Sequence, residues 1–447
     1  MGTSIRRLFI LLCLLAFSLL LLAEIPNTAL ASNYCGAGEM PEFRYGFAHL
    51  KSLLGATMGE PIECEHTDPE NGDTLQQTTT GLAYYRAATN VAAFTDGALH
   101  RAWTERGLVT WTGNGSDAPG TAVASALPEP SEGVVLPAVN LEAIFSAVPP
   151  DLAGLDRERL NTLVFTGDIG LVRMVNVTTV TTGDFMWPFR GTARILVGGD
   201  LTVANLEGPL VAGCELQYSS LEFCGDPRNV EGLEFAGIDL VGLSNNHIYD
   251  HGGAGLESTR RVVEGAGIDH AGEGVVSIQV VDGVRFGFVA CNLLWGYDPA
   301  ALTEEIGALK RGVDVVVAIV HWGAEYTSVP VAPAGTVTAP RDIARTLVAA
   351  GADLVLGNHP HWVQAVEMVD GVLVAYAHGN FIFDQQWSME TLRGVIGRYT
   401  FYDATLVAVE YLPVHIQDWG QPWPAGAEEG KAILAGMRAA SESLWPY

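Results

Sequence analysis

The chain has 447 residues, of which 48% are hydrophobic and only 17% are charged. This balance is typical of folded globular proteins and excludes a largely disordered chain. The formal net charge is −27, from 24 Lys and Arg against 51 Asp and Glu, so the chain lacks the basic surface that nucleic-acid binding requires. Because domains usually hold about 100–200 residues, the length predicts one large domain and a smaller partner.

The first residues have the pattern of an export signal. Arg6 and Arg7 precede an apolar run over residues 8–23, and Ala29-Leu30-Ala31 is a small-residue cleavage site. We therefore expect residues 1–31 to be a cleaved signal peptide and the protein to be secreted, outside the cytoplasm and at the cell surface. The alternative is an uncleaved membrane anchor, although a span needs roughly 20 apolar residues. A membrane is expected as a partner only in that case.

One of the six cysteines lies in the signal, and five would remain in an oxidising compartment. Proximity in sequence predicts that Cys35 pairs with Cys64 and that Cys214 pairs with Cys224. Cys291, in the apolar run 286–291, is then left as a buried thiol.

The composition changes twice along the chain. Residues 34–113 are rich in aromatic residues and are interpreted as a small accessory module. Tyr84, Tyr85, Trp103 and Trp111 can form a face that binds glycan or cell wall, but a small aromatic core closed by a disulfide explains them equally well. Residues 114–150 are rich in Pro, Ala, Gly and Ser, which predicts an extended linker with few contacts across it. Residues 151–447 then form the large domain.

In the large domain, apolar runs alternate with helical patterns, and this rhythm predicts an α/β fold. Strands are expected over residues 163–166, 201–204, 240–243, 285–290, 313–320, 354–357 and 372–377, and helices over 256–265, 301–311 and 340–350.

Five of the expected strands are followed by side chains of the types that commonly bind metals. They are Asp168, Asn205 with Glu207, the Asn-Asn-His of residues 245–247, His321, and the Asn-His-Pro-His of residues 358–361. In open α/β sheets the carboxyl ends of strands meet at one crevice. Carboxylates and imidazoles together bind divalent transition ions, and their number indicates two ions. A lone buried histidine is usually structural, so the prediction depends on the joint pattern. Asp200 precedes its strand and is expected at the opposite edge.

Six segments together resemble the bacterial capsule-synthesis CapA (poly-γ-glutamate) family. They are GDIGLVR from Gly167, ANLEGPL from Ala204, SNNHIYDHGGAGL from Ser244, HWGAEY from His321, GNHPHWVQ from Gly357 and GNFIFDQ from Gly379. The likeness runs in order from about residue 163 to 385. That family is similar in turn to calcineurin-like metallophosphoesterases, which implies a four-layer α/β/β/α sandwich and a site for two divalent ions, Mn, Fe or Zn.

The resemblance also implies roles for single residues. The matches to probable metal ligands are Asp168, Glu207, Asn246, His321, His359 and His361. His247 matches a histidine that protonates the leaving group or steadies the transferred group, and Asp250 is in place to orient it. The expected substrate-binding residues are Asn205, Glu325, Tyr326, Asn380, Asp384 and Gln385. Asn205 is alternatively a ligand, and ordinary loop or capping roles explain the other five equally well.

Three positions depart from the family pattern. Gly170 stands where phosphoesterases have a histidine, Asn358 replaces a histidine that is common before His-Pro-His, and His378 replaces an apolar residue. The resemblance implies a metal-dependent hydrolase that acts in the synthesis, processing or export of an anionic cell-surface polymer such as poly-γ-glutamate. Two alternatives stay open: a non-catalytic protein that binds the polymer or assists its export, and a plain phosphoesterase.

Overall fold

The computed structural model describes residues 34–36, 39–69, 72–86, 91–97, 99–104, 107–112, 135–294, 298–336 and 339–445. The predicted signal peptide and most of the predicted linker lie outside these ranges. Among the described residues, no helix combines the length and the apolar character that a membrane crossing requires. The disulfides Cys35–Cys64 and Cys214–Cys224 are present as predicted. Cys291 is a free thiol, and burial of its sulfur raises its pKa.

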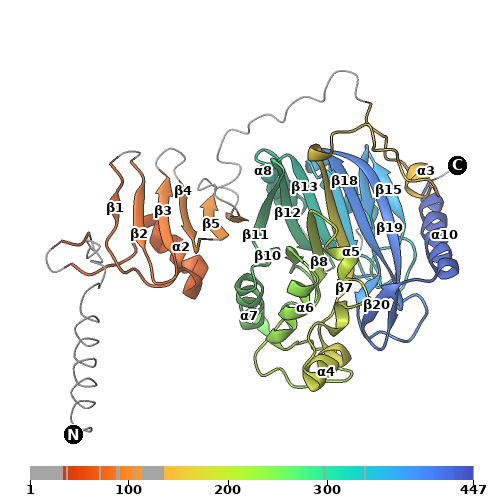
Figure 1. Cartoon of the computed structure of the whole chain (residues 1–447), viewed down its shortest axis with the longest axis horizontal. Helices are drawn as coiled ribbons and strands as arrows, with labels where there is room; N and C mark the ends of the chain where they lie inside the picture. The colour runs from red at the N-terminus through yellow and green to blue at the C-terminus, as the bar shows by residue number, and fades with distance from the viewer. Residues whose placement is uncertain are drawn as a thin grey trace, which may run out of the picture.

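Two β-sheets dominate the described part of the chain (Figure 1). The first sheet has, in spatial order, β1 (His66–Thr67), β2 (Thr74–Gln77), β3 (Leu82–Arg86), β4 (Val91–Thr95), β5 (Leu99–Thr104), β6 (Gly107–Thr112), β11 (Val275–Val281), β12 (Val284–Asn292), β13 (Val315–His321), β14 (Leu354–Asn358), β16 (Val372–Ala375) and β15 (Val366–Val369). The second has β10 (Asp269–Ala271), β9 (Leu240–Gly242), β8 (Leu201–Leu206), β7 (Leu160–Ile169), β18 (Arg393–Tyr402), β19 (Thr405–Gln417) and β20 (Gln421–Pro424), with β17 (Asn380–Ile382) paired to β7.

Helices lie between and around these strands, as the α/β prediction requires. They are α2 (Tyr45–Leu54), α3 (Leu141–Ile144), α4 (Arg173–Thr182), α5 (Ala193–Leu196), α6 (Val230–Phe235), α7 (Gly252–Gly265), α8 (Pro299–Lys310), α9 (Pro340–Ala350) and α10 (Ala427–Ser443). Helix α9 matches its predicted range, because Pro340 opens it and Gly351, with φ 115°, ends it. Helix α7 begins four residues earlier than the prediction of residue 256, at the pair Gly252-Gly253.

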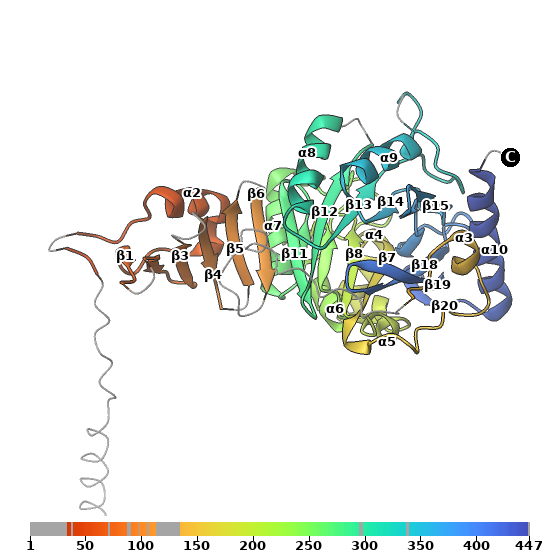
Figure 2. The same ribbon diagram turned by 90° about the horizontal axis from the view of Figure 1, so that it is seen from above.

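The two sheets enclose a common core. Alternate residues of β13, Val315, Val317 and Ile319, pack with Phe165 and Val203 of the second sheet. The intervening residues of β13 face α8 and α9 on the outer side of the first sheet. The outer side of the second sheet packs with residues of α4, α6 and α7. Figure 2 shows α8 and α9 on one side of the strands and α5 and α6 on the other.

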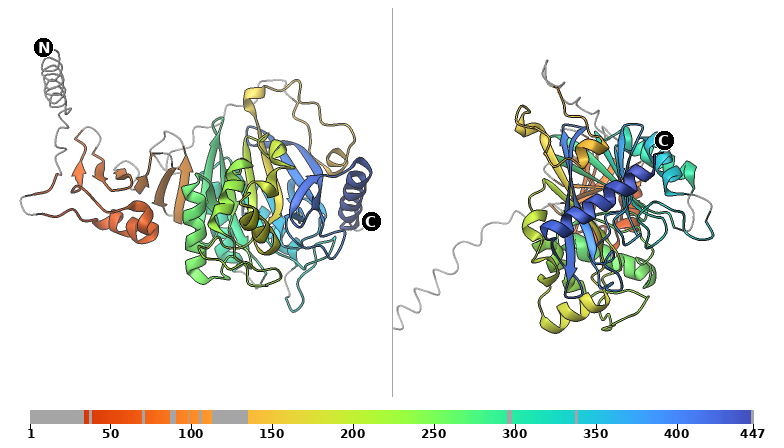
Figure 3. Two further views of the ribbon diagram at one scale, coloured as in Figure 1. Left: turned by 60° about the horizontal axis from the view of Figure 1, so that its bottom comes forward. Right: turned by 90° about the vertical axis from the view of Figure 1, so that its right-hand side faces the viewer.

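Helix α10 closes one end of the core between the sheets. It contacts β19 of the second sheet and β15 of the first, and its Ile433 and Met437 are buried in the common core. The right-hand view of Figure 3 shows this helix crossing the end of the molecule.

The N-terminal module and the large domain share one sheet. Strands β1 to β6 form an antiparallel meander, and β6 pairs in parallel with β11, with Thr110 opposite Ser277 (Figure 2). The Thr110 hydroxyl also donates to both carboxylate oxygens of Asp269, at 2.8 and 2.9 Å. The expectation of few contacts across the linker is therefore wrong, because the linker's composition carries no information on the pairing of β6. The boundaries of the two segments stay a prediction.

The side chains of the module favour the core interpretation over the glycan-binding one. Tyr84 and Trp111 are 3% and 2% exposed and belong to the apolar cluster on the outer side of the first sheet, which also includes residues of α8 and α9. The Tyr84 hydroxyl lies 3.1 Å from Nδ1 of His100. Two of the four aromatic residues considered for a binding face are therefore turned inward.

Candidate functional site

The polar strand ends meet at one edge of the core between the sheets. Asp168 lies opposite Asn205 in the pairing of β7 with β8, and His321 lies opposite Asn358 in the pairing of β13 with β14. His321 continues the alternation of Val315, Val317 and Ile319, which face the common core. Since neighbouring parallel strands end at the same edge, both sheets deliver polar side chains to the place where the apolar core stops.

A first group of buried ligand atoms comes from both sheets. One atom each of Asp168, Glu207 and His321 lies within 4.8 Å of the others, and all three residues are buried. Nε2 of His321 lies 2.8 Å from Oδ1 of Asn246, so the structure brings Asn246 to the same group.

A second group adjoins the first. Ligand atoms of Glu325, His359 and His361 also lie within 4.8 Å of one another. Nδ1 of His361 is 3.2 Å from Oδ2 of Asp168, and its Nε2 is 3.8 Å from Oε1 of Glu207. All six predicted ligands are thus in one place. Glu325, which the sequence placed only among the substrate-binding residues, joins the second group.

Several buried atoms in these groups have no hydrogen-bond partner among the described residues. They are both carboxylate oxygens of Glu207, Nδ1 of His321 and Nδ1 of His359. Buried polar atoms in folded proteins nearly always have partners, so these atoms indicate a bound group. Two ligand atoms that are each about 2.1 Å from one ion lie about 3 Å apart, which matches the distance of 2.8 Å between Nε2 of His321 and Oδ1 of Asn246. The residues present therefore fit divalent ions.

Burial sets the charge state of this site. Burial, with the nearby carboxylates of Asp168 and Glu325, raises the pKa of Glu207 well above its usual value. Burial, with the neighbouring imidazole of His359, lowers the pKa of His321 well below its usual value. Burial, with His361 beside it, lowers the pKa of His359 to about 3. A neutral imidazole is the form that binds metal, so both histidines are available as ligands at neutral pH.

The backbone of residues 357–361 is held in an unusual conformation. His359 has φ 94° and His361 has φ 58°, values that are uncommon outside glycine and concentrate at functional sites. A Cβ on Gly357 would lie 2.0 Å from the carbonyl oxygen of Tyr376, so this approach of two strands requires glycine. The N–H of His359 donates to Oδ2 of Asp168 at 3.3 Å. This loop therefore places two imidazoles around one carboxylate.

His247 and Asp250 form a pair beside the ligand Asn246. Nδ1 of His247 lies 2.8 Å from Oδ2 of Asp250, and the two side chains are 17% and 18% exposed. The ring of Phe223 stacks on the ring of His247, with 3.7 Å between centroids and 17° between planes. The pair is thus oriented, next to the candidate ligands and still open to solvent, as a proton donor to substrate requires.

Three of the six expected substrate-binding residues hold other site residues in place. Asn205 donates to Oδ1 of Asp168 at 2.9 Å. Oδ1 of Asn380 lies 2.9 Å from Nδ1 of His361, and the Asn380 amide donates to Gln385 at 3.1 Å. Contacts of this kind fix the orientation of ligating side chains.

The other three differ in exposure. The carboxylate of Asp384 is buried and pairs with Arg173. Glu325 is 42% exposed at the crevice, and Tyr326 has its ring centroid 6.1 Å from that of His361 and 6.1 Å from that of Trp387. Burial, followed by the charge of Glu325, raises the pKa of Tyr326 to about 12. Of these three, Glu325 is exposed and Tyr326 lies beside it and His361 at the crevice.

Two residues that the sequence did not single out lie behind the site. The guanidinium of Arg173 lies 4.8 Å from the Phe223 ring centroid and 5.5 Å from that of Phe383. The sequence offers two signals for these residues. Arg173 is a cation inside the GDIGLVR motif of an acidic chain, and Phe223 directly precedes Cys224. Asp200, by contrast, accepts from the N–H of Thr162 near the start of β7, the end away from Asp168.

Comparisons with known proteins select one family. The profile described as "Bacterial capsule synthesis protein PGA_cap" matches residues 162–385, a range that contains every candidate ligand. The chain is 28% identical over 301 residues to capsule biosynthesis protein CapA of Bacillus anthracis, covering 60% of this chain and 70% of the relative. It is also 28% identical over 308 residues to PGA biosynthesis protein CapA of Bacillus subtilis, covering 63% and 78%. A probable polyglutamine synthesis accessory protein of Mycobacterium tuberculosis is 27% identical over 258 residues, covering 49% and 66%.

Proposed function

The chain belongs to the bacterial capsule synthesis protein family PGA_cap, and from this premise we propose that it is a metal-dependent hydrolase that acts on an anionic cell-surface polymer of the poly-γ-glutamate type. The names of the two Bacillus relatives, which concern capsule and PGA biosynthesis, support the polymer. The predicted signal peptide supports action outside the cytoplasm, at the cell surface.

The proposal includes the fold of the metallophosphoesterases, a four-layer α/β/β/α sandwich. Its support is the shared apolar core between two sheets, with helices packed on the outer side of each. The candidate site at the strand ends is where such an arrangement gathers ligands from both sheets.

Mn, Fe or Zn would be held by two adjoining groups of ligands. The first consists of Asp168, Glu207, Asn246 and His321, and the second of His359 and His361 with Glu325. A bound divalent ion polarises the scissile group and activates water as a nucleophile near neutral pH. The hydrogen bonds of Asn205 to Asp168 and of Asn380 to His361 would keep these two side chains in the orientations that metal binding requires.

His247 would donate the proton that the leaving atom needs. Asp250 accepts from Nδ1–H of His247, which leaves Nε2 as the donating atom and stabilises the charged ring from which the proton departs. This pair carries the proposal, because a site that only binds polymer has little need for an oriented, solvent-reachable histidine next to its ligands.

The test compares three histidine variants on a panel of phosphoesters and a γ-glutamyl polymer. His247→Ala should leave bound metal nearly unchanged and lower turnover by roughly 10²–10⁴, the usual contribution of general acid–base catalysis. His359→Ala should instead lose metal. His415→Ala is the matched control, because His415 also pairs with a carboxylate, Glu429 at 3.1 Å, but lies outside the site. A purified protein without metal, or a His247→Ala variant that equals wild type on every substrate, would leave the binding role in place of the hydrolase.

A further inference from the structure

We propose that Phe223 is a positioning residue for His247, and that the loop closed by the Cys214–Cys224 disulfide holds it there. This inference rests on the proposed hydrolytic function for its effect on turnover, although its geometric part does not. Nothing in the family motifs points to Phe223, which lies outside all six of them.

Two contacts fix the imidazole of His247, one at the edge of the ring and one at its face. The hydrogen bond to Asp250 holds the Nδ1 edge of the ring, and the stacked Phe223 ring, 3% exposed, holds its face. With only the hydrogen bond, the ring can still tilt about the line from Nδ1 to Asp250. The stacking contact removes that motion, so Nε2 keeps one direction toward the crevice.

Phe223 also touches the second member of the pair. Its backbone N–H donates to Oδ2 of Asp250 at 2.6 Å, the same oxygen that faces Nδ1 of His247. The loop thereby helps to hold the carboxylate in place. One residue thus orients both the imidazole and the group that orients the imidazole.

The Phe223 ring sits in a built pocket. Val172 and Phe383 pack with it, and the Arg173 guanidinium, held by Asp384, lies over it. A Cβ on Gly208, which has φ 124°, would lie 3.3 Å from the Cβ of Phe223, so this glycine leaves room for the backbone of the loop. Packing against these residues therefore holds the ring in addition to the loop that carries it.

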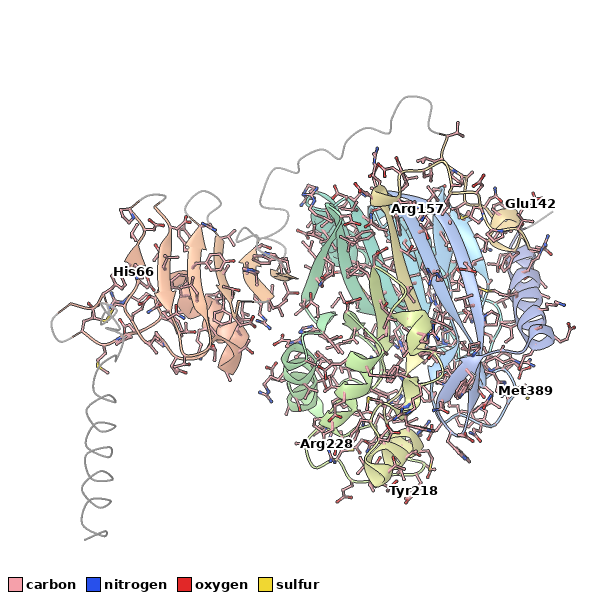
Figure 4. The ribbon with its side chains drawn as sticks, viewed as in Figure 1. His66, Glu142, Arg157, Tyr218, Arg228 and Met389 are labelled. Atoms are coloured by element: carbon pink, nitrogen blue, oxygen red, sulfur yellow. A yellow bond between two sulfur atoms is a disulfide. The ribbon has the colours of Figure 1, made fainter. Side chains whose placement is uncertain are left out.

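The rest of the loop has little to hold it. Residues 212–222 contain no helix or strand, and Leu216, Tyr218 and Leu221 are 41%, 64% and 80% exposed. Figure 4 shows Tyr218 at the far end of the large domain, beside α4. The disulfide joins Cys214 to the residue directly after Phe223. Closing the loop at this point restricts the backbone that carries Phe223.

The experiment measures kcat, KM and metal content for Phe223→Leu and Phe223→Tyr. Leucine keeps the backbone N–H and apolar volume but removes the ring face, so kcat should fall by roughly 10- to 100-fold, within the loss that about 1 Å of misplacement causes. KM and metal content should stay near wild type, and tyrosine should restore most of kcat. In a His247→Ala background Phe223→Leu should have no further effect, because Phe223 acts through His247. An equal fold-loss in both backgrounds would overturn the proposal.

The disulfide is tested with a matched pair of variants. Replacing Cys214 and Cys224 with Ser should lower kcat in the same way as Phe223→Leu, whereas replacing Cys35 and Cys64 with Ser should leave kcat unchanged, since that bridge lies in the N-terminal module. Unchanged kcat in the first variant would refute the role of the loop.

A crystal structure of Phe223→Leu separates this proposal from the proposed function. If wild type turns over no substrate, the hydrolase proposal fails, and the positioning proposal is decided by the His247 ring alone. Displacement of the ring or loss of its contact with Asp250 supports positioning. A ring unmoved from its place in wild type overturns it.

Discussion

Glu207 offers a test in which one substitution should have opposite effects with and without metal. The side chain is fully buried, and neither of its carboxylate oxygens has a hydrogen-bond partner by distance among the described residues. The charges of Asp168 and Glu325 raise its pKa, and the more weakly acting cation Arg173 lowers it. Burial of an unpaired carboxylate costs free energy, and the pKa of Glu207 is raised for that reason. Glu207→Gln keeps the shape and removes the charge.

Without metal, Glu207→Gln should stabilise the protein by about 1–3 kcal/mol, because a neutral amide is not repelled by Asp168 and Glu325, and each unit by which the pKa of Glu207 is raised corresponds to about 1.4 kcal/mol. One kcal/mol moves the melting temperature by roughly 2–4 °C in a domain of 150–250 residues and by less in a longer chain, so a rise of about 2–6 °C is expected. With metal at 100 times its Kd, wild type should gain about 2.7 kcal/mol. The variant should gain much less, because it has lost a ligand.

The assay is thermal unfolding in chelator and then in excess Mn or Zn, with metal content measured in parallel. Glu367→Gln is the matched control, since Glu367 is also buried but accepts from Arg341 at 3.0 Å and from the Tyr376 hydroxyl at 2.7 Å. Burial acts to raise the pKa of Glu367, but these contacts outweigh it and lower the pKa. This control should destabilise the protein under both conditions. If Glu207→Gln behaves like the control in chelator, the reasoning from unpaired oxygens is refuted.

Three further variants test contacts away from the ligands. Asp384→Ala leaves the buried guanidinium of Arg173 without its counter-charge and should cost about 3–5 kcal/mol in urea unfolding; a loss below 1 kcal/mol would mean that the guanidinium finds another partner. Thr110→Val removes the hydroxyl whose single proton is shared between the two carboxylate oxygens of Asp269, and should cost about 1.5–3 kcal/mol in the same assay, the range for one hydrogen bond to a charged group, so an unchanged midpoint argues against this link. Deletion of residues 32–113 exposes the edge of β11 and should give a fragment that aggregates in size-exclusion chromatography, and a monomer with the wild-type melting temperature would show that β6 is dispensable.

The central strands and the grouping of the candidate ligands could be predicted from sequence because local pattern and position agree there. Strands such as β13, with Val315 to Val320 ahead of His321, are continuous apolar runs that end in a polar residue. That is the pattern of a parallel strand buried on both faces. Each of the five predicted strand ends does deliver its polar side chain to the same edge of the core.

The long antiparallel strands β18 and β19 were not predicted, and their sequences explain why. Arg393–Tyr402 mixes buried and exposed residues, including the charged Arg398, and shows no continuous apolar run. The apolar run of Thr405–Gln417 covers only residues 406–409 and is interrupted at the charged Glu410. Their pairing with each other and with β7 depends on contacts far apart in sequence. Phe223 was missed for the same reason, because its contact with His247 is not encoded in either local segment.

The protein and the proposed polymer both carry negative charge, so electrostatic repulsion opposes their binding. The chain has a formal net charge of −27, and its candidate site holds the carboxylates of Asp168, Glu207 and Glu325. The nearby cation Arg173 is buried and already paired with Asp384. An anionic polymer is therefore repelled until divalent ions offset the carboxylates, since like charges at close range disfavour binding. Under the proposed function, metal binding would offset the charge of the site carboxylates and would thereby allow the polymer to bind at the same site.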